Sequence, residues 1–482
     1  MPAPSEWRYK PRRAPWYGGR KTLLAVGLIT LLTLSGLVIL ALVREQTGPE
    51  GFLVGLGLAV LPVPLLVTAF CWLDRVEPEP WRNLAFAFAW GACAATLVAI
   101  IANGFATQWL ASTIAAASPA TADTWGATVV APFVEESAKG AAVLLLFLFR
   151  RRNFDGIVDG VVIAGITATG FAFTENVLYL GNAFGEDQHL GYSGLQSTTA
   201  ATFFIRIVMS PFAHPLFTCV TGLAFGIASM AGHHQRVRRV LLPLMGLLTA
   251  MLLHGVWNGS STLGPYGFIT VYGLFMVPVF GVLTWLVIWA RQSGLRSIRA
   301  HLPAYQAAGW LTPPEPVALS SMKARNLART VTRHRHGRPA ARTVSEYTSF
   351  ATSLAFLRAR AHRGAPDRDF TAREQELLHH LWQRKHLAAP ALTHATHATA
   401  ARAYAPAQQR PQQGPQQGWA PQQQTPYGYP QPGYQQTGYE QGGYAQSGYR
   451  QPHYAPPGRP PHPSPYDAPH SASYGRPPGS AP

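Results

Sequence analysis

The first ~290 residues of this chain contain apolar runs that are each long enough to cross a bilayer. A helix needs about 20 such residues to span a hydrocarbon core of ~30 Å. Only 13% of all residues are charged, against ~25% in soluble domains, and 48% are hydrophobic. Since helices satisfy their own backbone hydrogen bonds in lipid, the runs predict membrane-spanning helices. Eight spans are expected, at residues 22–43, 52–73, 84–106, 126–149, 156–180, 198–231, 240–260 and 267–290.

Positive charge alternates between the segments that connect these spans. Lys and Arg lie before the first span, between the second and third, and after the fourth, sixth and eighth. The alternate loops at 107–125, 181–197 and 261–266 contain neither residue. Because basic loops stay on the cytoplasmic side, the pattern predicts a multi-pass protein of the plasma membrane with both termini cytoplasmic.

The chain divides into four regions by composition. Residues 1–21 form a basic N-terminal segment, and residues 22–291 hold all the expected spans. Residues 292–400 are basic with helical patterns, which predicts a cytosolic helical region. Residues 401–482 are rich in Gln, Pro, Gly and Tyr, so this tail cannot form a core and is predicted to be disordered. The expected fold class is all-α, a polytopic membrane helix bundle with a disordered C-terminal tail.

The net charge of +17 follows from this topology. Much of it lies in the basic loops and in residues 291–363, where it would face anionic lipid headgroups. No recognised nucleic-acid-binding module accompanies the charge, so nucleic acid is not an expected partner. The expected partners are the lipid bilayer and whatever the site within the spans acts on.

The fourth span contains three charged residues. Glu135 and Glu136 are adjacent, and Lys139 follows Glu135 by one helical turn. One charged side chain at the bilayer centre costs at least ~2.5–3.5 kcal/mol on insertion scales. Lys139 can neutralise one carboxylate and leave the other free to act. Since a second acid there is hard to justify by structure alone, this cluster is the first candidate for a functional site.

Polar residues of three other spans fall at the same depth. Glu175 lies in the fifth span, His214 in the sixth, and His254 with Asn258 in the seventh. Counted at ~1.5 Å per residue from the cytoplasmic end of each span, the two histidines, Glu175 and Glu135 all lie about 20–28 Å from the inner boundary. A single membrane histidine is often only an interhelical hydrogen bonder, but two at one depth beside acids favour a site.

Arg206, in the sixth span, falls beyond this layer by the same count, so anchoring at the outer interface is its expected role. The sixth span is overlong and contains two prolines, Pro211 and Pro215. A broken span is therefore expected there, and a wet cavity beside the break would admit water.

Glutamate and histidine together are the residue types that activate water. Two neutral imidazoles and a carboxylate leave the fourth position of Zn²⁺ open, as in catalytic zinc sites. In this hypothesis the ligands are His214, His254 and Glu175. A remaining glutamate, Glu135 or Glu136, is then the general base of metal-assisted hydrolysis. A version without metal, in which the histidines only orient water, stays open.

Four motifs in spans four to seven carry these residues. They are Glu135-Glu136-x-x-Lys139, Phe171-x-x-x-Glu175-Asn176, His214, and His254-x-x-x-Asn258. In this order they resemble the PrsW family of intramembrane proteases, a relative of the CAAX prenyl-protease superfamily. The loop Leu73 to Trp81 is similar to that of actinobacterial members, and the resemblance covers about residues 50–290.

The resemblance implies an intramembrane metalloprotease, a hydrolase of peptide bonds in membrane-anchored proteins. For the family's namesake it implies an anti-sigma factor as substrate, and hence a role in signalling. It also implies Asn258 as a donor to the developing oxyanion. Two other classes fit the residues: a proton-coupled transporter, in which the acids and histidines relay protons, and a non-enzymatic scaffold that uses the tail. The sequence does not identify a partner of the tail.

The topology is tested by cysteine-accessibility labelling in a background without native cysteines. Single cysteines within 107–125 and 181–197 should react with impermeant reagent from outside, and those within 150–155 and 232–239 only after permeabilisation. Labelling of 150–155 from outside would contradict both the orientation and the shared depth of the polar residues.

Overall fold

The computed structural model describes residues 18–113, 119–150, 154, 156–232, 235–364 and 369–404. These residues form helices and short connections without any β-strand, so the all-α fold class is confirmed for the described chain. The segment 1–17 and the tail from 405 onward, with its predicted disorder, lie outside the described residues.

The α-helices are α1 (Gly18–Ala59), α2 (Pro62–Leu73), α3 (Trp81–Ala89), α4 (Thr96–Thr113), α5 (Pro119–Trp125), α6 (Ala131–Phe149), α7 (Ile157–Leu190), α8 (Thr198–Phe203), α9 (Ala213–Ser229), α10 (Arg236–Ser260), α11 (Gly264–Val271), α12 (Val277–His301), α13 (Pro303–Ala307), α14 (Glu315–Leu319), α15 (Met322–His362) and α16 (Phe370–Tyr404).

Among the described residues, five helical segments are long and apolar enough to cross a membrane. Two of them, at 52 and 72 residues, exceed the length of one crossing. Each contains a glycine with positive φ, Gly48 at 70° and Gly264 at 70°, where the helix breaks. The count of eight spans therefore stays a prediction. The segments are Thr22–Leu73, Trp81–Thr113, Ile157–Leu190, Thr198–Ser229 and Arg236–Ala307.

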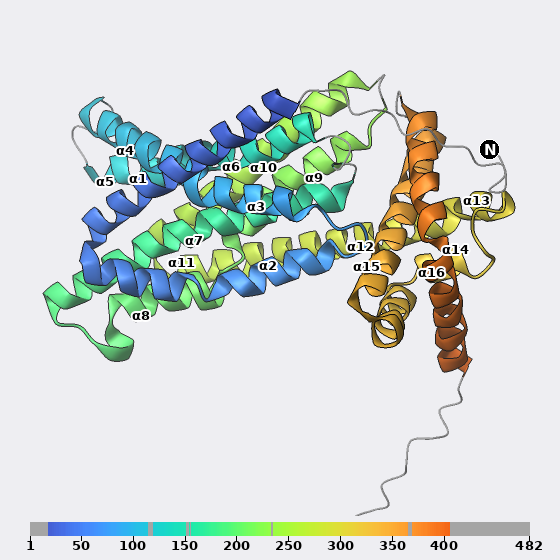
Figure 1. The fold of residues 1–482 in the computed structure, drawn as a ribbon. Coiled ribbons are helices and arrows are strands. Elements are labelled where there is room, and N and C mark those ends of the chain that lie inside the picture. The colour runs from blue at the N-terminus through green and yellow to red at the C-terminus, as the bar shows by residue number, and fades with distance from the viewer. Residues whose placement is uncertain are drawn as a thin grey trace, which may run out of the picture. The chain divides into compact units, whose positions relative to one another are not determined.

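Helix α7 runs through the middle of the membrane helices (Figure 1). In its most apolar window 83% of the residues are buried, against 17% in Thr22–Leu73. Its N-cap is Gly156, whose backbone N–H donates to Asp159 Oδ2 at 2.9 Å. Its C-cap is Gly191, which lies in the left-handed region. The helix continues ten residues past the expected end of the fifth span. The helices that contact it are α1, α2, α3, α4, α6, α8, α9 and α12.

Glycines let the neighbouring backbones approach α7 closely. A Cβ at Gly160 would lie 2.0 Å from the carbonyl oxygen of Gly222 in α9. A Cβ at Gly91 would lie 1.9 Å from the carbonyl oxygen of Thr167, and one at Gly55 would lie 2.3 Å from that of Val177. Lipid provides no hydrophobic driving force between helices. Small residues at such crossings allow close backbone approach, so that van der Waals packing holds the helices together.

The sixth span is broken, as the prolines predicted. α8 continues into a π-helical turn, Phe204–Met209, and α9 starts at Ala213. The Met209 carbonyl oxygen accepts a hydrogen bond from Tyr272 Oη at 2.8 Å. The Ile205 oxygen accepts both the backbone N–H of Ser210 at 3.0 Å and its hydroxyl at 2.6 Å. Side chains therefore satisfy the backbone that the break exposes.

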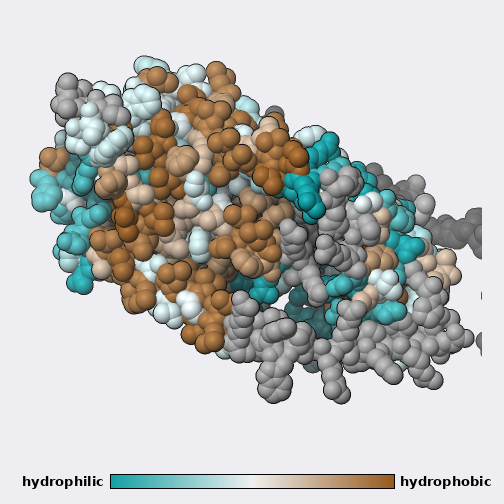
Figure 2. Space-filling view, turned by 90° about the horizontal axis from the view of Figure 1, so that it is seen from above, coloured by the Kyte–Doolittle hydropathy of each residue, from teal (hydrophilic) through white to brown (hydrophobic). Residues whose placement is uncertain are grey.

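The outer surface of these helices is apolar. Figure 2 shows a broad hydrophobic area, with hydrophilic residues gathered toward its margins. Large side chains point outward there, for example Leu23, Leu65 and Leu274, which are 73%, 67% and 79% exposed. This arrangement suits lipid as the surrounding solvent.

The described chain after residue 291, where the membrane-spanning region was predicted to end, is helical. Helix α12 continues through that position to His301. Helices α13 to α16 then share a separate hydrophobic core with Val76 from the turn after α2. Tyr305 and Tyr347 are fully buried in this core, and their hydroxyls donate to Glu374 and Glu315.

Substituting Gly160 with Val should destabilise the protein by ~1–3 kcal/mol or more, because the new side chain meets the backbone of α9. Gly104→Val is the matched control, since nothing lies within 4 Å of a Cβ at that helical position. Thermal melting in detergent should show a lower Tm for the first variant only. Equal Tm values would contradict the close approach of α7 and α9.

Candidate active site

Three charged side chains of α6 meet inside the bundle. Lys139 is fully buried, and its Nζ lies 2.7 Å from Glu136 Oε1 and 3.6 Å from Glu135 Oε2. The Phe171 ring of α7 covers the ammonium, with Nζ 4.2 Å from the ring centroid. Spacings of three and four residues place all three charges on one face of the helix. Since removing one partner of a buried ion pair costs ~3–5 kcal/mol, the acids and Lys139 depend on one another.

Glu136 holds His254 in one orientation. Glu136 Oε1 lies 3.1 Å from His254 Nδ1, and Oε2 accepts a hydrogen bond from Thr218 Oγ1 at 2.8 Å. The Phe217 ring stacks on the imidazole, with centroids 4.9 Å apart. A carboxylate that accepts a hydrogen bond from Nδ1–H selects the tautomer with a lone pair on Nε2. His254 Nε2 then faces the interior of the site.

Glu175 of α7 holds His214 in the same manner, through the opposite nitrogen. Glu175 Oε2 lies 2.6 Å from His214 Nε2 and 2.5 Å from Arg206 Nη2. Arg206 Nε donates to Asn176 Oδ1 at 2.7 Å. When Nε2–H donates to Glu175, the lone pair of His214 is on Nδ1, which lies 3.3 Å from Lys139 Nζ.

The structure places Arg206 in this cluster, so its expected role at the outer interface is wrong. Its guanidinium pairs with Glu175 and lies 4.0 Å from the centroid of the Tyr179 ring. The depth count assumed one continuous helix. The π-helical turn Phe204–Met209 and the irregular residues 210–212 break that helix, so a uniform rise per residue does not apply.

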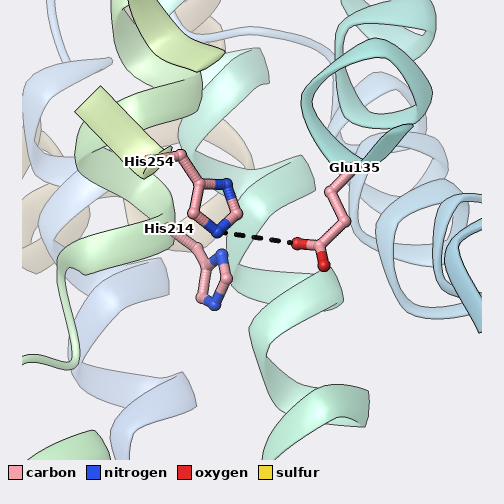
Figure 3. Close-up of side chains that lie close together, drawn as sticks. All are labelled: Glu135, His214 and His254. Carbon is pink, nitrogen blue, oxygen red and sulfur yellow. Dashed lines mark ion pairs between the residues drawn. The ribbon is translucent and has the colours of Figure 1, made fainter. Parts of the chain in front are cut away.

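Glu135 presents the free oxygen of the cluster. Its Oε1 accepts a hydrogen bond from Asn103 Nδ2 at 3.4 Å, whereas Oε2 is buried without a hydrogen-bond partner among the described residues. Oε2 lies 3.9 Å from His254 Nε2. Figure 3 shows the Glu135 carboxylate pointing across the site toward the two imidazoles. This oxygen is therefore available to a water molecule or an ion.

Asn258 hydrogen-bonds elsewhere. Its Nδ2 donates to the Ala127 oxygen at 2.9 Å. Ala127 belongs to a π-helical turn, Gly126–Val130, directly before α6. Although Asn258 follows His254 by one helical turn, its described hydrogen bond ties α10 to that turn rather than to the acids or the histidines.

The residues fit a metal ion. Ligand atoms of Glu135, His214 and His254 all lie within 4.8 Å of one another. Counted in their ordinary states, three carboxylates and two cations leave the cluster one negative charge, which favours a further cation. Lys139 keeps Glu136 as its nearest partner if His214 Nδ1 binds an ion. The carboxylate grouped with the histidines is Glu135, whereas the sequence hypothesis placed Glu175 there. The charges counted are Glu135, Glu136, Glu175, Lys139 and Arg206.

Sequence reasoning missed the roles of three residues that hold the site together. Thr218 supports Glu136, Asn103 contacts Glu135, and Arg206 pairs with Glu175. Thr218 follows His214 by four residues on α9, so helical spacing alone could have indicated it. Asn103 is an amide in an apolar span, a weaker signal. The position of Arg206 required the break in the helix to be seen.

Comparisons with known proteins find similarity to one family. Residues 79–283 match a family described as PrsW family intramembrane metalloprotease. The Protease PrsW of Clostridioides difficile is 31% identical over 131 residues, which are 27% of this chain and 49% of that protein. That of Geobacillus kaustophilus is 28% identical over 199 residues, 41% of this chain and 76% of that protein. For Bacillus subtilis the values are 27% over 153 residues, 32% and 59%.

The fold and the buried acid–histidine cluster define a helical, polytopic membrane protein with a candidate active site among its helices. Residues 79–283 are similar to the PrsW family, and the relatives that the chain matches are proteases of that name. It spans about half the length of the first curated relatives that it matches. No solved structure matches it.

Proposed function

We propose that the protein is an intramembrane protease that hydrolyses peptide bonds of membrane-anchored proteins. One observation carries the proposal: Glu135 Oε2 has no described hydrogen-bond partner and faces two imidazoles that other carboxylates orient. Such a set binds water and takes its proton. The match of residues 79–283 to the PrsW family favours hydrolysis over the transporter and scaffold alternatives.

Glu135 is the proposed general base. Its Oε2 accepts the proton of the attacking water, and its neighbour Lys139, 3.6 Å away, stabilises the carboxylate before that transfer. Glu136 and Glu175 are positioning residues, since each holds one histidine in the tautomer that presents a lone pair to the site. Lys139, which lies between both acids of α6 and His214, keeps the three groups together.

The groups that would hold a metal ion are the Glu135 carboxylate, His214 Nδ1 and His254 Nε2. Zn²⁺ suits one carboxylate and two imidazoles, and when bound it makes water a nucleophile at neutral pH and polarises a carbonyl. Glu135 can bind through one oxygen and accept a proton at the other. Asn258 serves as an oxyanion donor only if its amide turns from the Ala127 oxygen.

The proposed substrate is a membrane-anchored protein whose scissile bond reaches the depth of Glu135. An anti-sigma factor is the substrate class that the family resemblance suggests. The break between α8 and α9, directly before His214, is the proposed route for water. Residues 405–482 contain no residue of the site and are proposed to act outside the chemistry.

Replacing Glu135 with Gln should lower cleavage by ~10²–10⁴-fold, because an amide of the same shape accepts no proton. Glu136→Gln should also lower cleavage strongly, since His254 loses its orienting carboxylate. Purified variants in liposomes are assayed on a panel of single-pass substrates. Glu45→Gln is the exposed control and should cleave as the wild type does. Normal cleavage by Glu135→Gln would refute the hydrolase proposal.

Metal content separates the ligands from the positioning residues. His214→Ala, His254→Ala and Glu135→Gln should each lose bound zinc and activity together. Glu175→Gln should weaken zinc binding by only ~10–100-fold, as expected for a residue that orients a ligand. Elemental analysis and chelation with zinc add-back provide the measurements. Full activity at well below one metal per chain would refute zinc and leave the metal-free mechanism.

A further inference from the structure

A polar cavity lies away from the acid–histidine cluster, where the turn after α2 meets α15. Its volume is about 450 Å³, within the range of small-molecule sites. Arginine and hydroxyl side chains dominate its polar lining. They are Arg75, Arg325, Arg329, Ser345, Thr348 and Ser349.

Arg325 is a buried cation with only neutral partners. Its guanidinium donates to the carbonyl oxygens of Leu319 at 2.6 Å and Val76 at 2.8 Å, and to Thr352 Oγ1 at 2.9 Å. Burial lowers the pKa of Arg325 to about 10, so the side chain remains charged at neutral pH. Arg325 therefore joins the turn to α15 and gives the cavity a fixed positive charge.

The other two arginines are exposed and free to bind a ligand. Neither Arg75 nor Arg329 forms an ion pair with any carboxylate among the described residues. Burial raises the pKa of the neighbouring Asp74 to about 8, so this acid is mostly neutral at pH 7. Glu77 lies near Arg325 and accepts a hydrogen bond from Ser353. The residues that line the cavity include three arginines and no carboxylate, so the lining is positive.

The donors suit a phosphate group. Guanidinium groups bind phosphate oxygens in pairs, so the two exposed arginines are the main donors. The hydroxyls of Ser345 and Thr348 already donate to the backbone oxygens of Ala341 and Val344, which leaves the Ser349 hydroxyl to donate to a ligand. Ser345, Thr348 and Ser349 lie on successive turns of α15, on the side of the helix that lines the cavity. An amine or a neutral sugar would leave the positive charge without compensation.

The cavity adjoins the apolar helices at the level of interfacial aromatic residues. The apolar segment Thr22–Leu73 ends two residues before Arg75. Trp72 is 40% exposed with Arg291 4.5 Å from its ring centroid, and Trp81 is 73% exposed beside Arg82. Tryptophan and arginine in such positions mark the layer of lipid headgroups.

We propose that this cavity binds the phosphate group of an anionic ligand, and that an anionic phospholipid headgroup is the source that its position favours. Binding adds contacts between the turn at Arg75 and helix α15, so the ligand would stabilise their packing. The proposal does not depend on the proteolytic function, because none of its residues lies in the acid–histidine cluster.

The test uses the full chain purified in detergent. Native mass spectrometry counts bound short-chain phosphatidic acid, with phosphatidylcholine of the same chain length as the zwitterionic comparison. The wild type should bind phosphatidic acid preferentially. Arg75→Gln and Arg329→Gln should each weaken that binding about tenfold, and the double variant more. Arg333→Gln, an exposed arginine of α15 that does not line the cavity, should bind as the wild type does.

Inorganic phosphate distinguishes the sources. If it displaces phosphatidic acid at similar concentration, the site belongs to soluble phosphate, and if it does not, the lipid headgroup is the ligand. Both results support a phosphate site. Wild-type affinity in the double variant, or no binding of either ligand by the wild type, would overturn it. Melting of the ligand-free variants shows whether they fold. If a variant does not fold, the absence of ligand binding by the wild type still overturns the proposal.

Discussion

The neutralisation of carboxylates inside a membrane is the constraint on which this structure depends. Three glutamates lie within the bundle, and Lys139 and Arg206 are the cations that make their burial tolerable. Lys139 comes from the same helix as two of the acids, so that pairing forms as soon as α6 folds. Arg206 reaches Glu175 from another segment, so that pairing requires the whole bundle.

Close packing positions the groups that this electrostatic arrangement brings together. α7 carries Glu175 and Phe171, and its glycines bring α1, α3 and α9 into backbone contact with it. α9 in turn carries His214 and Thr218, one residue for each carboxylate on the neighbouring helices. Since each histidine is held by a carboxylate from a different helix, a shift of any helix would alter the site. Such preorganisation suits the proposed hydrolysis, because a misplacement of about 1 Å can lower a catalytic rate 10²-fold.

Much of the site could be predicted from the sequence because charged and polar residues are rare and costly within apolar membrane spans. Glu135, Glu136, Lys139, Glu175, His214 and His254 were all named from depth and spacing, and the structure brings these six together. The pairing among them could not be predicted. Glu135 rather than Glu175 faces both imidazoles, and Asn258 bonds to a backbone oxygen. Depth gives one coordinate, whereas pairing also depends on how each helix is rotated about its axis.

By itself the sequence determined that the chain is helical and resides in a membrane. It also determined which charged residues lie within the spans and that the sixth span breaks. These follow from local properties: hydropathy, helical period and proline. Only the tertiary structure decided that Arg206 lies beside Glu175, that α12 runs past the last span, and that a basic cavity forms between Arg75 and α15. Each of these depends on contacts between residues far apart in the chain, whose positions are fixed by packing rather than by local pattern.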